Sequence, residues 1–208
     1  MPSPWAAPHE VTVSGLKTWK HLGTRTLYRH ERAVFREDLL EPPGGQERPY
    51  PVLQLGGSAG IVPLTSRNEV ILVRQYRHIP RELCWEIPGG GIHPGESPED
   101  AAQRELREEA GYRAGRLRRL GGFWPNNAYL DELIHVYLAE DLVADPLPAD
   151  QDEHLERQAF PFQEALAMAQ DDRITCGLTK LAILWAAAAA RMTGPSSSDP
   201  PAERVEER

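Results

Sequence analysis

The chain has few cysteines and no long apolar run. Its 208 residues include only two cysteines, Cys84 and Cys176, which is too few for a disulfide framework and typical of a protein from a reducing compartment. The longest apolar stretch, residues 181–190, is about half the length that a helix needs to cross a bilayer. No stretch resembles a secretory signal. We therefore expect a cytoplasmic protein without a membrane partner.

Positive charge is also scarce. The chain carries 23 Lys and Arg residues against 31 Asp and Glu residues, which gives a net charge of −8 and a pI near 5.4. Nucleic acids and anionic membranes bind basic surfaces, so neither is an expected partner. An acidic protein that handles phosphates needs metal ions and a local cluster of arginines. The 40% hydrophobic content is sufficient for one substantial domain, with or without a small appendage.

Alternating and β-branched segments predict an α/β protein. We expect helices at 162–169 and 179–191 and strands at 24–29, 33–41, 50–55, 59–64, 70–76, 84–87, 116–123, 133–139 and 155–161. The acidic, proline-containing segment 140–151 is expected to be a loop. We divide the chain into a partly mobile N-terminal arm (1–20), an N-terminal β segment (21–57), a main domain (58–192) and a disordered tail (193–208).

A glycine loop is followed by a helix that carries three glutamates, namely Glu105, Glu108 and Glu109. Ser97 suits the start of this helix, Pro98 its first position and Gly111 its end, which predicts a helix over 98–110. At spacings of i, i+3 and i+4 the three carboxylates share a narrow arc and repel one another by a few tenths of a kcal/mol per pair. The pattern therefore favours a cation site. The alternative for any one glutamate is a solvated face with a nearby arginine as its partner.

The helix is part of a longer spaced pattern. Gly90, five residues, Glu96, seven residues and then RELREEAGY (104–112) resembles the signature of the Nudix hydrolases at every fixed position. This resemblance implies an α/β/α sandwich with a mixed sheet over 58–192, preceded by a small antiparallel β segment. It also implies hydrolysis of a diphosphate bond with Mg²⁺ or Mn²⁺, two or more ions per site, which suits carboxylate ligands.

The same resemblance assigns roles to individual residues. The metal ligands would be Glu105, Glu108, Glu109 and the backbone carbonyl of Gly89, with Glu96 as a further ligand or close neighbour. Arg104 would orient these carboxylates. Glu105 and Glu109 count as catalytic, together with a general base from a later acidic loop, for which Asp152 and Glu153 are the candidates and Glu153 is our choice. A merely solvated acidic loop is the alternative.

Residues outside the signature concern the substrate. The run VRQYR (73–77) followed by WEIPG (85–89) resembles the branch that cleaves nucleotide sugars, in particular ADP-ribose pyrophosphatases. This implies substrate contacts from Arg74, Arg77, Glu86 and Glu132. A strand-edge ion pair is the alternative for Arg77 and Glu86. The triple glycine 89–91 and the asparagines 126–127 depart from the usual pattern of the branch, so they leave the particular sugar open.

The leading hypothesis is Mg²⁺-dependent hydrolysis of ADP-ribose to AMP and ribose 5-phosphate. One alternative keeps the chemistry and takes GDP-mannose or another nucleoside diphosphate derivative. Another is a sensor domain that binds a nucleotide sugar without cleaving it, although such sensors usually lose signature acids and carry a DNA-binding module, and neither feature is seen in this sequence. The resemblance further implies a homodimer formed through the β segment 21–57.

Overall fold

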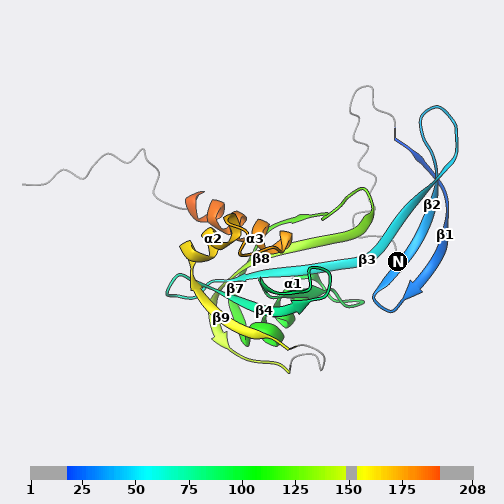
Figure 1. The fold of residues 1–208 in the computed structure, drawn as a ribbon. Coiled ribbons are helices and arrows are strands. Elements are labelled where there is room, and N and C mark those ends of the chain that lie inside the picture. Colours follow the sequence, from blue (N-terminus) through cyan, green and yellow to red (C-terminus); the bar gives the residue numbers. More distant parts are fainter. Residues whose placement is uncertain (1–17, 149–153, 193–208) are drawn as a thin grey trace, which may run out of the picture. The chain divides into compact units, whose positions relative to one another are not determined.

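The structure is a computed structural model that describes residues 18–148 and 154–192 (Figure 1). These residues form two compact units. The first contains residues 18–55 together with Ala128–Asp131, and the second contains the rest of the described chain. The general base candidates Asp152 and Glu153, most of the N-terminal arm and the tail 193–208 lie outside the described residues.

The first unit is an antiparallel sheet. Strands β1 (Lys20–His30) and β2 (Ala33–Glu41) form a hairpin, and β2 pairs on its other side with the first part of β3 (Arg48–Pro63). Two glycines with positive φ, Gly44 and Gly45, turn the chain between β2 and β3. Cross-strand partners share a face, so this register decides which side chains of the unit lie together.

The second unit begins within β3. Its later residues pair with the short strand β6 (Gly89–Gly91) and neighbour β8 (Leu130–Ala144), which in turn pairs with β7 (Tyr112–Phe123). The loop predicted from residue 140 onward is wrong for residues 140–144. These residues continue the ladder with the start of β7, and Glu140 pairs with Arg116 at 3.0 Å, so acidic side chains line an exposed strand.

A second, three-stranded sheet completes this unit. Strand β4 (Glu69–Arg77) lies in its middle, between β5 (Glu82–Glu86) and β9 (Glu156–Pro161), and both pairings are antiparallel. Val73 stands opposite Glu86 on one side and opposite Arg157 on the other. Glu86, Val73 and Arg157 thus form one row (rung) across the three strands, in which two charged residues flank a buried valine.

Helices cover both sides of the strands in the second unit. Side chains alternate along β8, so Val136 and Leu138 face a core cluster shared with α2 (Phe162–Gln170) and α3 (Gly177–Met192) (Figure 1). Tyr137 and Ala139, on the opposite face of β8, belong to a second cluster shared with the helix that carries the glutamates. The predicted α/β/α sandwich with a mixed sheet is confirmed. Among the residues that the structure describes, none of the helices combines the length and apolarity that a bilayer crossing demands.

Candidate active site

The glycine loop brings backbone against a carboxylate. Gly89 and Gly90 pair with Gly60 and Ala59 of β3, and a Cβ would meet backbone at Gly89 and the Glu105 side chain at Gly90. A Cβ on Gly89 would lie 2.5 Å from the Ala59 carbonyl oxygen, and a Cβ on Gly90 would lie 2.4 Å from Glu105 Oε1. The Glu105 carboxylate therefore lies directly against the backbone of Gly90.

The helix after this loop starts as the sequence predicts. Ser97 Oγ accepts a hydrogen bond from the Asp100 backbone N–H at 3.1 Å, and α1 (Pro98–Glu105) follows with Pro98 at its first position. The apolar residues that recur at four-residue spacing, Ala102 and Leu106, are fully buried. They hold one side of the helix against the core, which leaves the neighbouring side free to carry polar groups.

The last turn of the helix is a π-turn, so the regular α-helix predicted over 98–110 is wrong there. Residues Leu106–Ala110 form η1, which Gly111 ends in the left-handed conformation at φ 83° with its N–H bonded to the Leu106 carbonyl. Several carbonyls of η1 have partners from outside the helix; for example, the Leu147 N–H donates to the Arg107 carbonyl at 3.2 Å. Such single π-turns are common at functional sites.

The glutamates reach the glycine loop from this turn. Glu109 is only 2% exposed, and its Oε2 accepts a hydrogen bond from the Gly89 backbone N–H at 2.8 Å. Glu105 is 7% exposed above Gly90, whereas Glu108 lies nearer to solvent. Two nearly buried carboxylates therefore lie beside one stretch of loop backbone.

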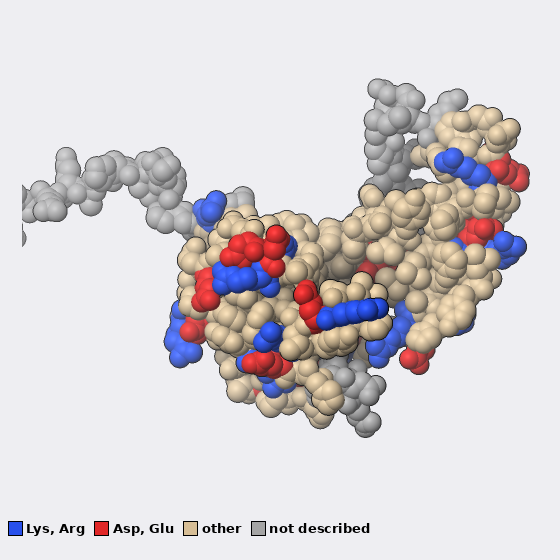
Figure 2. Space-filling view, viewed as in Figure 1, with Lys and Arg blue, Asp and Glu red and all other residues tan. Residues whose placement is uncertain are grey.

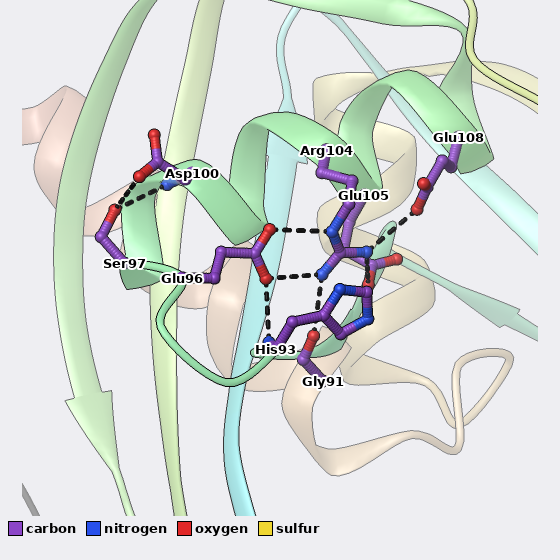
Figure 3. Close-up of polar contacts among 8 residues, drawn as sticks. All are labelled: Gly91, His93, Glu96, Ser97, Asp100, Arg104, Glu105 and Glu108. Atoms are coloured by element: carbon purple, nitrogen blue, oxygen red, sulfur yellow. Dashed lines mark hydrogen bonds and ion pairs between the residues drawn. The ribbon is translucent and has the colours of Figure 1, made fainter.

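Arg104 connects the carboxylates (Figure 3). Its Nε and Nη2 donate to the two oxygens of Glu96 at 2.8 and 2.9 Å, and Nη1 donates to Glu105 at 2.7 Å and to Glu108 at 3.0 Å. A further bond from Nη2 reaches the Gly91 carbonyl at 2.9 Å. The bond to Glu96, joined by those to the other two carboxylates, raises the pKa of Arg104, and the same bond lowers the pKa of Glu96 against the opposing effect of burial.

The donor set has the chemistry that a hard divalent cation prefers, namely carboxylate oxygens beside a backbone loop. Within residues 18–148 and 154–192, however, no group of three or more His, Cys, Asp or Glu side chains is arranged as a metal site. The positive charge shared by Glu96, Glu105 and Glu108 is that of Arg104. The residue types thus fit a metal site, and in this structure Arg104 provides the compensating charge.

The Glu96–Arg104 pair predicts a pH-dependent stability. Because the pKa of Glu96 lies below its ordinary value of 4.5, the pair stabilises the fold fully above that value and loses its effect as the pH falls through the lowered pKa. We expect Glu96→Gln to cost about 1.5–3 kcal/mol at neutral pH, the range of a hydrogen bond to a charged group. Thermal melts should show a gap to the wild type that closes in acid. A gap that does not narrow as the pH falls below 4.5 would contradict this assignment.

Arg77 and Glu86 form an ion pair across β4 and β5. Arg77 Nη2 lies 2.5 Å from Glu86 Oε2, and Gln75 Nε2 lies 3.4 Å from the same oxygen. The bond to Glu86 raises the pKa of Arg77, and the negative charge of Glu109 acts in the same direction. The pair thus lies within the electrostatic reach of the glutamate helix. Its predicted contact with substrate stays a prediction.

Arg74 and Glu132 lie elsewhere in the second unit. Arg74 is on the face of β4 opposite to Arg77, with its guanidinium 5.4 Å from the ring centre of Trp85, a residue that packs on the larger core cluster. The placement does not favour a role shared with Arg77. Glu132 accepts a hydrogen bond from Ser58 Oγ at 2.7 Å, and Ser58 pairs with Gly91, so Glu132 lies beside the edge of the glycine loop.

Arg157 contacts the glutamate helix, and the sequence did not predict this contact. Its Nη2 donates to the Glu108 carbonyl at 2.9 Å, and its Nε donates to the Glu109 carbonyl. Nothing in the sequence around Arg157, near the start of a predicted strand, indicates such a contact. The signal appears only once β9 is placed beside β4, which brings Arg157 to the end of the glutamate helix.

Comparison with known proteins identifies the family. The NUDIX domain model matches residues 54–176. The chain is 31% identical to an ADP-ribose pyrophosphatase of Bacillus subtilis over 73% of this chain and 83% of the relative, and 33% identical to one of Mycobacterium tuberculosis over 69% and 71%. A crystal structure of an ADP compounds hydrolase superposes with a TM-score of 0.77 at 25% identity, over 86% of this chain and 97% of that one.

The chain therefore belongs to the Nudix family. Within it, the chain is a Nudix hydrolase of the ADP-ribose pyrophosphatase-like branch. Hydrolases of this family generally use divalent metal ions. The resemblance inferred from the signature is confirmed at the level of family and branch.

Proposed function

We propose that this hydrolase cleaves the diphosphate bond of a nucleotide sugar, with ADP-ribose as the leading substrate and AMP and ribose 5-phosphate as products. The observation that carries the proposal is the gathering of the signature glutamates at the glycine loop, where Glu105 rests on Gly90 and Glu109 is bonded to the Gly89 N–H. The similarity to ADP-ribose pyrophosphatases of Bacillus subtilis and Mycobacterium tuberculosis supports this choice of substrate.

The same residues are proposed to hold Mg²⁺ or Mn²⁺, two or more ions per site. The ligands would be Glu105, Glu108, Glu109 and the Gly89 carbonyl, with Glu96 as a further ligand or as a neighbour through Arg104. When bound, such ions neutralise phosphate charge and lower the pKa of a water molecule. Arg104 orients the carboxylates through its bonds to Glu105 and Glu108. In this proposal Glu105 and Glu109 are catalytic because they hold the ions.

The substrate is proposed to lie against the Arg77–Glu86 pair. A guanidinium matches phosphate oxygens, and a carboxylate accepts hydrogen bonds from sugar hydroxyls. Glu132, at the edge of the glycine loop, and Arg74, on the other face of β4, stay predicted contacts. Glu153 as general base also stays a prediction.

A substrate panel tests the function. The protein would be incubated with ADP-ribose, GDP-mannose and other nucleoside diphosphate sugars in Mg²⁺, and the nucleoside monophosphates released would be separated and measured. We expect AMP from ADP-ribose and loss of activity with a chelator. Faster turnover of GDP-mannose would select the alternative substrate. Binding by calorimetry without turnover would instead select the sensor domain and refute the proposed hydrolysis.

We also propose a homodimer formed through the first unit. Tyr28, Phe35, Leu39 and Leu55 are exposed, and the strand register places them on one face of its sheet. Size-exclusion chromatography with light scattering should give about twice 23.3 kDa. Leu39→Arg should shift the protein to the monomer, whereas the control Thr26→Glu, on the opposite face, should not. A wild-type mass of one chain would refute the dimer.

Charge and thiols support two further proposals. On the face seen in Figure 2, basic and acidic side chains lie beside one another, and with a net charge of −8 this favours a small-molecule substrate over a nucleic-acid partner.

Cys84 and Cys176 are both free thiols. Unpaired cysteines are typical of reducing compartments, so we propose a cytoplasmic location.

A further inference from the structure

We propose that Arg157 is a positioning residue for the catalytic helix, because its guanidinium holds the backbone of Glu108 and Glu109 and thereby sets the direction of their carboxylates. The inference rests on the proposed function, since it assumes that these carboxylates serve a metal-dependent hydrolysis. Arg157 acts through the two glutamates and has no assigned contact with the substrate.

The contact spans two elements of the second unit. Arg157 Nη2 donates to the Glu108 carbonyl at 2.9 Å and Nε donates to the Glu109 carbonyl, so one side chain joins two consecutive peptide groups. Arg157 itself stands on β9, opposite Val73 of β4, and the next residue along that rung is Glu86. The sheet that carries the proposed substrate contact thus also fixes the end of the glutamate helix.

The carbonyls at the end of this helix need hydrogen-bond donors from outside the helix. The last carbonyls of a helix have no partner within it, and they form the negative end of the helix dipole. Gly111 ends η1 immediately after Ala110, so the carbonyls of Glu108 and Glu109 lie in this last turn. A guanidinium is positively charged and offers several donors in a fixed plane, which suits two neighbouring acceptors.

The backbone direction matters because the carboxylates have little freedom. Glu109 is 2% exposed, and its carboxylate accepts a hydrogen bond from the Gly89 N–H. A rotation of the Glu109 peptide group would therefore displace the carboxylate from this bond. Glu108 is held by Arg104 at 3.0 Å. Displacements of about 1 Å in catalytic groups cost on the order of 100-fold in rate.

Other bonds hold the same turn in the fold. The Leu147 N–H donates to the Arg107 carbonyl at 3.2 Å, and Arg107 Nε donates to the Asp145 carbonyl at 3.2 Å. The Asp145 N–H donates to the Gly111 carbonyl at 3.0 Å. Loss of Arg157 should therefore alter the orientation of the glutamates without unfolding the helix.

The test compares Arg157→Gln and Arg157→Lys with the wild type. The matched control is Arg116→Gln, which removes another exposed strand arginine, paired with Glu140 at 3.0 Å. We expect Arg157→Gln to lower kcat about 100-fold with KM nearly unchanged. Mn²⁺ affinity, measured by electron paramagnetic resonance without substrate, should also fall. Arg157→Lys should recover part of both losses because it keeps the charge, and Arg116→Gln should behave as the wild type.

The results separate the alternatives. Wild-type kcat and Mn²⁺ affinity in Arg157→Gln would overturn the inference, and so would a rise in KM with both of these unchanged, since that would mean contact with substrate. If Arg157→Gln does not fold, Arg157→Lys decides: wild-type kcat and Mn²⁺ affinity overturn the inference, and a loss of both supports it. If the wild type cleaves no nucleotide sugar, the proposed function fails, yet the Mn²⁺ measurement still tests the positioning.

Discussion

Glu109→Gln is expected to lower kcat about 1,000-fold, within the range known for removal of a group that acts in the chemical step. Glutamine has nearly the same shape, and its amide oxygen can still accept the hydrogen bond from the Gly89 N–H that Glu109 accepts at 2.8 Å. The substitution removes the charge and replaces one carboxylate oxygen with an NH2 group, which cannot bind a cation. Because Glu109 is buried beside the glycine loop, its charge contributes little to solubility, and the proposed function assigns that charge to the bound ions.

The matched control for this substitution is Glu99→Gln. Glu99 lies in the first turn of the same helix and is exposed, so its loss should leave kcat nearly unchanged. Product release from ADP-ribose and Mn²⁺ binding would be measured for both variants. If Glu109→Gln turned over substrate within about threefold of the wild type, Glu109 would hold no ion that matters for catalysis.

Gly90→Ala is expected to lower kcat about 100-fold while the melting temperature stays close to that of the wild type. The new Cβ would lie 2.4 Å from Glu105 Oε1 and 2.7 Å from its Cδ, so the carboxylate must move. The end of a flexible side chain moves at little cost to the fold. Activity should therefore fall far more than stability.

The neighbouring glycines provide two controls. A Cβ on Gly91 would meet no atom within 4 Å, so Gly91→Ala should be close to the wild type in both activity and stability. A Cβ on Gly89 would lie 2.5 Å from the Ala59 carbonyl oxygen, so Gly89→Ala should destabilise the fold. Equal activity in Gly90→Ala and Gly91→Ala would show that the position of Glu105 does not limit the reaction.

The spacing of the signature glutamates predicted a cation site, with a nearby arginine as the alternative partner of any one glutamate. The structure shows an arginine contact, in which Arg104 is bonded to Glu96, Glu105 and Glu108. Arg104 is itself a fixed position of the signature. This contact is the arginine partner of the alternative, and the divalent ions stay a prediction that rests on the family and on the type of ligand.

The sequence by itself determined the family, the α/β/α class and the start of the glutamate helix, because these depend on local spacing: Ser97 and Pro98 begin the helix, and the glutamates follow at helical intervals. It also predicted Gly111 as the end of the helix, which the left-handed φ confirms. Local rules were sufficient for the start of this helix and for its end at Gly111.

Only the tertiary structure decided the rest, because those contacts join residues far apart in the chain. The bonds from Arg157 to the Glu108 and Glu109 carbonyls span 49 and 48 residues, and they depend on β9 lying beside β4. The π-turn and the extension of β8 to Ala144 likewise involve strand pairing and partners outside the local segment. Helical periodicity and residue type do not encode which strand a distant segment joins.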